Sequence, residues 1–438
     1  MPLFTMTSQF ILGISIIIAL HELGHMLLAK LFGMRVESYN IGFPPKIIQF
    51  KWGETEYSLG AIPLGGSVKI AGMVDESLDA AHLSDTPQPW EFRAKPAWQR
   101  LLVMLGGIIC NVLSGILIFI AITFSLGDTY LTKDEVNKHG ITPYTLGASI
   151  GFQEGDKITH INGRGFTKFN DVMKPSTLLA EGGYYTVLRQ GQEVHIAITS
   201  NFLKQLADCQ GQQNFIAPRA PFEVDEVQQS SPAAQAGLQQ GDQIVEVAGQ
   251  ATPYFHQLRA ALEAHAGMPV SIRYVRDGVT YHTTAQIGAT GKLGFLPKIL
   301  LNPVHQQYSI LKAAAIGTSR AFEVVRTNLM ALRKVTTGQV SFSQSLSGPI
   351  GIAQIFGKHF DWIHFWHIVG LLSMILAFTN LLPIPALDGG HMVLIICEMI
   401  VGRRLPQRLL EVVQMIGIAL LLLLSGYAIL NDFYKLFR

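Results

Sequence analysis

The chain has 438 residues, with 33 Lys and Arg against 31 Asp and Glu, so its net charge at pH 7 is only +2. Charged residues make up 15% of the chain and the mean hydropathy is +0.30, which favours a membrane protein that also has a polar part. The balanced charge and the lack of a long basic run argue against nucleic acid as a partner. Two of the three cysteines lie in apolar runs, so we expect no disulfide framework and a free thiol at Cys209.

Four apolar runs are long enough to cross a bilayer, which takes about 20 mostly apolar residues. They cover about Phe10–Phe32, Leu101–Leu126, Trp362–Leu387 and Leu409–Leu430. The first run has no basic residue before Lys30 and no small-residue cleavage site after it, so we interpret it as a retained span and not as a signal peptide. The lipid bilayer is therefore an expected partner of the chain.

Basic residues gather in two of the segments between the spans. The segment after the first span includes Arg35 and Arg100, and the short loop before the fourth span includes Arg403, Arg404 and Arg408. By the positive-inside rule both segments face the cytoplasm, and both termini and the large middle segment then lie outside. Two basic residues in the C-terminal tail are the one feature against this topology.

The large middle segment contains an internal repeat. The stretch Gly147–Phe166 resembles Ala233–Thr252: small residues lead to a Gly-Asp turn, then to a strand and a hairpin turn. Two copies at this spacing predict tandem domains of about 85 residues each. The second copy resembles a PDZ domain, a fold that binds an extended peptide as an added strand. We expect the first PDZ domain at 128–219 and the second at 220–300.

A peptide groove is predicted only in the second copy. Its residues Leu293, Gly294 and Phe295 fit the apolar-Gly-apolar pattern of the loop that holds a peptide carboxylate in PDZ domains. The matching place in the first copy, Asn214–Pro218, has no glycine, so its groove need not capture a C-terminus. The alternative is that both domains are rigid spacers that bind no peptide.

The stretch Gln306–Thr337 is predicted to be one amphipathic helix. Ala315, Phe322, Val325 and Leu329 recur at helical spacing, and the stretch is too polar to span a membrane. We expect this apolar stripe to pack against the membrane bundle. The alternative is that the helix lies on the outer membrane surface.

The first span contains the sequence HELGH. His21 and His25 are four residues apart, so on a helix they project from one face, about one turn from each other. Two imidazoles at that spacing can hold one Zn²⁺, and Glu22 can then deprotonate an attacking water. The alternative is a pair of histidines that only pack between helices. A charged group within a span usually has a functional reason, which favours the metal site.

The third run ends in NLLPIPALDGGHM and supplies a third candidate ligand. Pro383 and Pro385 are expected to break the helix, which could turn the carboxylate of Asp388 toward the two histidines. Asn380 could donate a hydrogen bond to the developing oxyanion. His391 is a rival ligand, ranked lower because it follows the Gly pair. For Asp388 the alternative is a helix cap at the membrane surface.

HELGH in a first span, with NLLPIPALDGG in a late span, resembles the site-2 protease family of intramembrane metalloproteases. The stretches Tyr57–Met73, Phe92–Arg100 and Leu346–Ala353 are similar to further parts of that family, so the likeness covers nearly the whole chain. One departure is Ile108, where relatives often have Pro. The resemblance implies a multi-pass α-helical membrane protein with four transmembrane helices, a membrane-associated β-loop and two extracytoplasmic PDZ domains of α+β type.

The family also implies roles for these residues. Zn²⁺ would be held by His21, His25 and Asp388, with Glu22 as general base and acid and Asn380 holding the substrate backbone. The β-loop would bind the substrate as an added strand, with contacts at Gly65, Gly66 and Val68, and Pro383 and Pro385 would line the same substrate site.

The implied substrate is a single-span membrane protein already trimmed outside by another protease, such as an anti-sigma factor, or a remnant signal peptide. The PDZ pair would act as a size filter in the periplasm, and the chain would lie in the bacterial inner membrane with its active site toward the cytoplasmic side. Glu22 is about 12 residues into the first span, or roughly 18 Å from its outer end, which agrees with that depth. The expected parts are 1–127 (first two spans with the β-loop), the two PDZ domains, 301–361 (amphipathic helix and connector) and 362–438 (last two spans).

Two other classes of protein remain as alternatives. A membrane scaffold could use its PDZ domains to gather partners, but it would not need His21, Glu22, His25 and Asp388 together. A metal transporter would need polar residues through the bilayer, and the fourth span has only Glu411 and Gln414 near one end.

Overall fold

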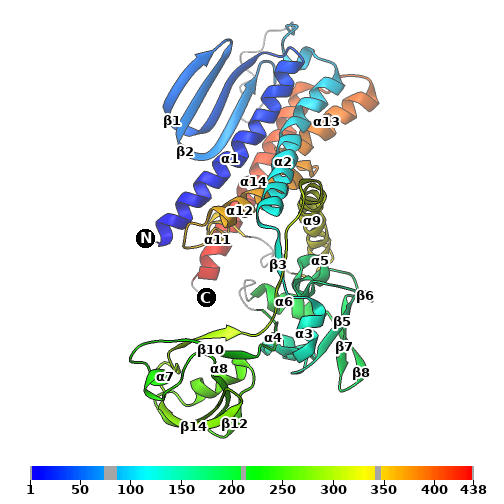
Figure 1. Ribbon diagram of the computed structural model, residues 1–438. Helices are drawn as coiled ribbons and strands as arrows, with labels where there is room; N and C mark the ends of the chain where they lie inside the picture. The colour runs from blue at the N-terminus through cyan, green and yellow to red at the C-terminus, as the bar shows by residue number, and fades with distance from the viewer. Residues whose placement is uncertain (1, 74–85, 209–213, 341–346, 437–438) are drawn as a thin grey trace. The chain divides into compact units, whose positions relative to one another are not determined.

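The computed structural model describes residues 2–73, 86–208, 214–340 and 347–436. The chain divides into two compact units (Figure 1). The membrane unit consists of Met1–Gly127 and Gln307–Arg438, and the sheet unit consists of Asp128–Gln306. Cys209, the expected free thiol, lies outside the described residues, as does Leu346.

The membrane unit is built on long apolar helices. Four of its described helices are long and apolar enough to cross a membrane: α1 (Pro2–Leu31), α2 (Ala97–Leu126), α12 (Trp362–Leu381) and α14 (Gln407–Leu436). It also contains α9 (Ile310–Thr336), α11 (Pro349–Ile355), α13 (Asp388–Val401) and the 3₁₀ turn η2 (Phe92–Ala94). The apolar composition that predicted four spans therefore forms four helices of spanning length.

The third span is shorter than predicted. Helix α12 ends at Leu381 and not at Leu387, and a separate helix, α13, begins at Asp388. The reason is the pair Pro383 and Pro385, because proline has no backbone N–H to continue a helix. The predicted break is thus present, but the apolar run through 382–401 concealed that a new helix follows it.

Helix α9 packs against the bundle, as predicted, but through a face that only partly coincides with the predicted one. Its buried residues include Ala313, Gly317 and Ala321, and a Cβ on Gly317 would stand 2.6 Å from the backbone nitrogen of Ile120 in α2. Of the predicted stripe, Val325 packs against the cluster of Phe119, Ala321 and Met374, whereas Ala315, Phe322 (51% exposed) and Leu329 (58% exposed) point away. Small residues let two helix backbones approach closely, and that close approach decides the packing face here.

A long, bent β-hairpin follows α1 in the membrane unit. It consists of β1 (Val36–Trp52) and β2 (Thr55–Ile70), and Figure 1 shows it beside α1. The residues 36–41 pair on one side with 66–70 and on the other with 56–59, while 48–52 pair with 55–59. Val36 and Ile70 are buried with Met26, Ala29 and Val103, so the hairpin is anchored to α1 and α2 by an apolar cluster.

The sheet unit contains two modules with the same sheet order. The first sheet has the order β6-β5-β7-β8 and the second β12-β11-β13-β14. The strands of the first module are β3 (Asp128–Tyr130), β4 (Ile141–Pro143), β5 (Lys157–Ile161), β6 (Arg164–Gly165), β7 (Tyr184–Arg189), β8 (Gln192–Ala197) and β9 (Ile216–Pro218). Its helices are α3 (Lys133–His139), α4 (Thr145–Ser149), η3 (Phe169–Met173), α5 (Pro175–Leu178) and α6 (Ser200–Asp208).

The second module starts after β9. Its strands are β10 (Phe222–Val227), β11 (Gln243–Val247), β12 (Gln250–Ala251), β13 (Pro269–Arg276), β14 (Val279–Gln286) and β15 (Phe295–Ile299), with helices α7 (Pro232–Gln235) and α8 (Phe255–Ala264). Strand β9 pairs with β4, and β10 pairs with β15, so each module closes on its own last strand. Strand β16 (Val304–Gln306) then pairs with β3 and returns the chain to the start of the unit.

The repeated Gly-Asp turns have the same structure in both modules. The buried carboxylate of Asp156 accepts two hydrogen bonds from Arg189, at 2.8 and 2.7 Å. In the second module Asp242 accepts two from Arg276, at 2.6 and 2.7 Å. A bidentate guanidinium–carboxylate pair of this kind fixes the turn to the third strand of its sheet. The sequence repeat therefore corresponds to a structural repeat.

Candidate active site

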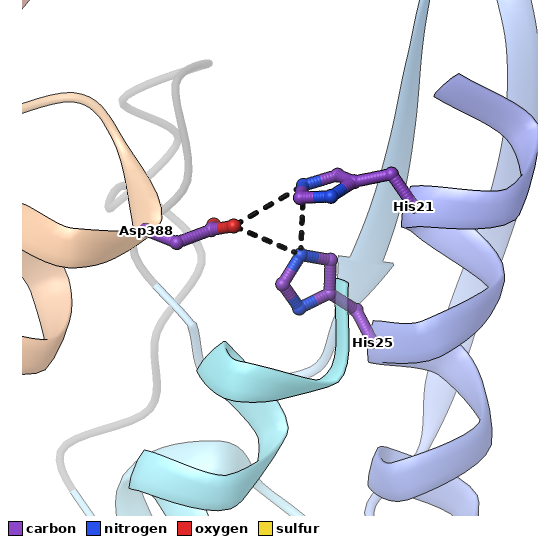
Figure 2. A group of neighbouring side chains, drawn as sticks. All are labelled: His21, His25 and Asp388. Atoms are coloured by element: carbon purple, nitrogen blue, oxygen red, sulfur yellow. Dashed lines mark hydrogen bonds and ion pairs between the residues drawn. The ribbon is translucent and has the colours of Figure 1, made fainter. Parts of the chain in front are cut away.

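Helix α1 presents two imidazoles on one buried face. His21 and His25 project from successive turns, and both side chains are buried. Their ring centroids are 4.8 Å apart and the ring planes are nearly perpendicular. Figure 2 shows both rings directed away from α1 toward one point. The helical spacing of HELGH thus brings the two rings together as predicted from the sequence.

Glycines make room for these rings where α1 crosses α2. A Cβ on Gly24 would stand 2.5 Å from the carbonyl carbon of Gly106, so the two helix backbones are in direct contact. A Cβ on Gly107 would stand 2.5 Å from Cε1 and 2.6 Å from Nδ1 of His21, and it would also collide with His25. The space occupied by the imidazoles therefore exists because residue 107 has no side chain.

Asp388 meets the two histidines from a distant part of the chain. Its Oδ2 atom lies 3.1 Å from Nε2 of His21 and 3.5 Å from Nε2 of His25 (Figure 2). The two Nε2 atoms are 3.2 Å apart, and one donor atom from each of the three residues lies within 4.8 Å of the others. Within the described part of the chain, His21, His25 and Asp388 form the group of side chains that lie close enough together to hold a metal ion.

The irregular segment 382–387 determines where Asp388 points. Ala386 has φ +71°, a left-handed conformation that is uncommon for a residue with a side chain. A Cβ on Gly389 would stand 2.8 Å from the carbonyl oxygen of Asn380, so α13 begins in tight contact with the end of α12. On the other side, Gly417 of α14 packs on Pro385. The chain is thus held tightly where it delivers the carboxylate.

The three donor atoms fit a zinc ion. Two imidazole nitrogens and one carboxylate oxygen form a donor set that zinc hydrolases use, with the fourth position open. Oδ2 of Asp388 is buried and has no hydrogen bond from any described group, although the two rings face it. A cation among the three atoms would satisfy this oxygen.

Groups on α2 hold the other nitrogen of each ring. Nδ1 of His25 lies 2.8 Å from the carbonyl oxygen of Val103, which accepts its N–H and leaves Nε2 free to bind a metal. The amide nitrogen of Asn111 lies 3.2 Å from Nδ1 of His21. Turning that amide over would present Oδ1, which has no partner among the described groups, to the N–H of Nδ1. Asn111 was not predicted from the sequence as part of the site. Its position as a polar residue within an apolar span could have indicated that role.

Glu22 lies on α1 next to the β-hairpin. Its side chain is half-buried, and a Cβ on Gly66 of β2 would stand 3.3 Å from Cγ of Glu22. The backbone of Val68 forms a hydrogen bond with the same carboxylate. Two of the residues predicted to bind substrate therefore lie beside the predicted general base.

The remaining predicted residues of the membrane unit have different positions. Asn380, in the last turn of α12, is buried and its Nδ2 lies 3.3 Å from Nε2 of His21. Gly65 is buried against the ring of Phe43. Pro383 is exposed and Pro385 is half-buried. His391, the rival ligand, lies on α13 and is not part of the three-residue group.

The predicted PDZ groove lies in the sheet unit. The side chain of Leu293 is buried in the core of the second module, and its backbone carbonyl accepts the N–H of Ala233. Gly294 has φ +83° and packs against Ser231, where a Cβ would collide. Phe295 is half-buried at the start of β15. The glycine of the predicted pattern is thus required by the backbone, whether or not a peptide binds.

Comparison with known proteins identifies the family. The family model described as peptidase family M50 matches residues 9–424. The chain is 29% identical over 458 residues to the regulator of sigma-E protease RseP of Salmonella typhimurium, covering 98% of each protein. It is 29% identical over 452 residues to the regulator of sigma E protease of Haemophilus influenzae, again covering 98% of each. A protein of Vibrio cholerae whose name describes a zinc metalloprotease is 28% identical over 459 residues, with 98% of each covered. The chain therefore belongs to peptidase family M50, the site-2 protease family of metalloproteases.

Proposed function

We propose that the chain is an intramembrane zinc metalloprotease that hydrolyses a peptide bond within the transmembrane segment of a pre-trimmed single-span protein. The substrate class is anti-sigma factors or remnant signal peptides. The observation that carries this proposal is the convergence of His21, His25 and Asp388 on one point between helices of spanning length. Membership of family M50 and relatives named as zinc metalloproteases support zinc as the ion.

The proposed chemistry assigns one task to each residue. Zinc, when bound, supplies a Lewis acid and can lower the pKa of water to about 7. Glu22 takes the proton of the attacking water and returns it to the amine nitrogen of the leaving peptide. The amide of Asn380 donates a hydrogen bond to the carbonyl oxygen of the scissile bond, where negative charge develops. The carbonyl oxygen of Val103 accepts the N–H of His25, and the side-chain amide of Asn111 bonds to Nδ1 of His21, so both rings keep their orientation.

The substrate is proposed to bind as an added strand. The stretch 66–70 of β2 pairs with 36–41 on one side, and no described strand pairs with its other edge. An open edge can accept an extended peptide by backbone hydrogen bonds. Because Gly66 and Val68 adjoin Glu22, a strand bound at this edge would pass close to the proposed base. Unwinding the substrate helix in this way would expose the peptide bond to water.

The proposed topology places the active site toward the cytoplasmic side of the bacterial inner membrane. Arg93 and Arg404, from the two basic segments, line one cavity, so the two segments meet at one end of the membrane unit. Glu22 is about 14 Å from the end of α1 at Leu31 and about 30 Å from its start, which puts it nearer to that same end. The sheet unit would then lie in the periplasm, where its two modules, proposed as PDZ domains, act as a size filter.

The proposal is tested with a trimmed single-span model substrate expressed together with the full-length chain. The native chain should cleave it, and Glu22→Gln should not, because an amide cannot accept the proton. Both purified forms should contain about one zinc per chain, because Glu22 is not a ligand. Cleavage by Glu22→Gln at the native rate would refute the role of Glu22, and absence of zinc from both forms would refute the metalloprotease.

Two variants on α13 separate the ligand from its rival. Asp388→Ala should lose zinc together with cleavage, since it removes one of three ligands. His391→Ala, three residues along the same helix, should keep its zinc. The reverse result would assign the third ligand to His391. Zinc content is measured by mass spectrometry of the purified protein, independently of any substrate.

A further inference from the structure

A cavity of about 220 Å³ lies in the membrane unit, apart from the three candidate ligands. It is bounded by Gly72, Met73 and Pro87, by turn η2, by the first turn of α2, by α13 from His391 to Glu398 and by the beginning of α14. None of His21, His25 and Asp388 lines it. The cavity lies at the end of the unit where α2 and α14 both begin, so its mouth is at the depth of the lipid headgroups if these helices span the bilayer.

The charged residues of this cavity include one arginine that has no carboxylate partner among the described residues. Arg93, Arg100 and Arg404 line it together with a single acidic residue, Glu398. Both carboxylate oxygens of Glu398 have partners: one lies 2.5 Å from Arg100 and the other accepts the backbone N–H of Leu405 at 3.0 Å. Outside the lining, Glu91 lies 2.6 Å from Arg93. Among the described residues, therefore, no carboxylate pairs with Arg404.

Two buried hydrogen-bond donors in the lining also lack an acceptor. Nε of Arg100 and Nε2 of Gln414 form no hydrogen bond with any described group. The two residues are only 9% and 4% exposed. Buried donors are nearly always satisfied in folded proteins, so two in one cavity call for a partner that supplies acceptors. Together with Arg404, they favour an anion.

Apart from His391, the rest of the lining is apolar. Leu394, Ile395 and Leu410 contribute to it, from α13 and α14. A ligand with an anionic head and a hydrocarbon part would match both halves of the cavity. A phosphate has only acceptor oxygens at its surface, and arginine binds it with matching geometry. Basic pockets between helices at a membrane face suit the headgroups of anionic lipids.

We propose that this cavity is a binding site for a phosphate group, with Arg404, Arg100 and Gln414 as the residues that recognise it. The phosphate is that of an anionic phospholipid such as phosphatidylglycerol, whose acyl chain lies along the apolar wall. A free phosphate ester has the same head chemistry. The site is built from the beginnings of α2 and α14 and from α13, the helix that carries Asp388. A bound phosphate would therefore contact three helices at once.

The test is native mass spectrometry of the delipidated full-length chain, titrated with three probes. Phosphatidylglycerol has both the phosphate and the chains, diacylglycerol has only the chains, and glycerol 3-phosphate has only the phosphate. We expect phosphatidylglycerol to bind at least tenfold more tightly than diacylglycerol. Binding of glycerol 3-phosphate as tight as that of the lipid would assign the same site to a free phosphate ester. Equal binding of the lipid and diacylglycerol would overturn the proposal.

Matched variants locate the binding in this cavity. Arg404→Gln should weaken phosphatidylglycerol binding about tenfold or more, as should Gln414→Leu. Arg403→Gln is the control, because Arg403 is the adjacent residue, is exposed and does not line the cavity. Equal weakening by Arg403→Gln and Arg404→Gln would show general surface attraction and refute the site. Arg404 is exposed, so this comparison holds even if Gln414→Leu does not fold.

Discussion

The substitution Gly107→Ala should abolish metal binding while leaving the helices in place. A Cβ at residue 107 would stand 2.5 Å from Cε1 of His21, whereas ordinary van der Waals contact begins at 3.4 Å. The ring must therefore move by about 0.9 Å, the difference between these two values. Metal–ligand distances tolerate only about 0.2 Å of deviation. Neither ring can retreat freely, because His25 is also contacted and both lie against the backbone of α2.

The size of the effect follows from this displacement. A misplacement of about 1 Å in an active site can reduce the rate about 100-fold, so cleavage should fall by at least that factor. Zinc content should drop well below one per chain. Overpacking of this kind should also lower the free energy of unfolding by about 1–3 kcal/mol. The assays are zinc content, cleavage of the model substrate and thermal unfolding in detergent.

Gly426→Ala is the matched control for this experiment. It makes the same chemical change in a long apolar helix, but a Cβ at residue 426 would meet no atom within 4 Å. Zinc content and cleavage should therefore stay at native values. If Gly107→Ala also kept both, the contact between residue 107 and the two rings would not shape the site, and the reasoning would be wrong.

Three further predictions concern other parts of the chain. Asn111→Leu should lower zinc affinity, measured by competition with a chelator, about tenfold, because it removes the group that orients His21. Its thermal stability should change no more than that of Gly426→Ala. Asp242→Ala should destabilise the second module, measured by limited proteolysis in denaturant, because it leaves Arg276 and the backbone N–H of Gln239 without the buried carboxylate that accepts from both. With the native Cys209 first replaced by Ser, a membrane-impermeant thiol reagent should label Tyr281→Cys and not Arg403→Cys in intact cells; the reverse pattern would contradict the proposed topology.

The membrane helices and the histidine pair were predictable because their signals are local. About 20 apolar residues in succession form a helix of spanning length, and a spacing of four puts His21 and His25 on one face regardless of context. The tandem modules were predictable for a similar reason, because the Gly-Asp turn and the following strand recur within a short window. Asp242 and Asp156 occupy equivalent turns in the structure.

The parts that the sequence did not reveal depend on contacts between distant segments. Hydropathy alone could not distinguish one long helix from α12 followed by α13, because the side chains of the intervening residues 382–387 are apolar. Only the backbone is irregular there. The amphipathic pattern of α9 indicated Phe322, Val325 and Leu329, yet only Val325 of these packs on the bundle, and the closest contact is through Gly317. Hydrophobic periodicity predicts which face of a helix is buried when the opposite face contacts water. It does not predict the packing face of a helix surrounded by lipid and other apolar helices.

Close helix contact and polar chemistry depend on each other at this site. Inside an apolar bundle, imidazoles and a carboxylate are costly to bury unless they find partners. The absence of side chains at Gly24 and Gly107 lets α1 and α2 touch, and this contact brings the carbonyl of Val103 and the amide of Asn111 within reach of the two rings. The same residues that permit packing thus supply the space and the partners for the polar group. A variant that separates the helices should therefore lose the metal before it loses the fold.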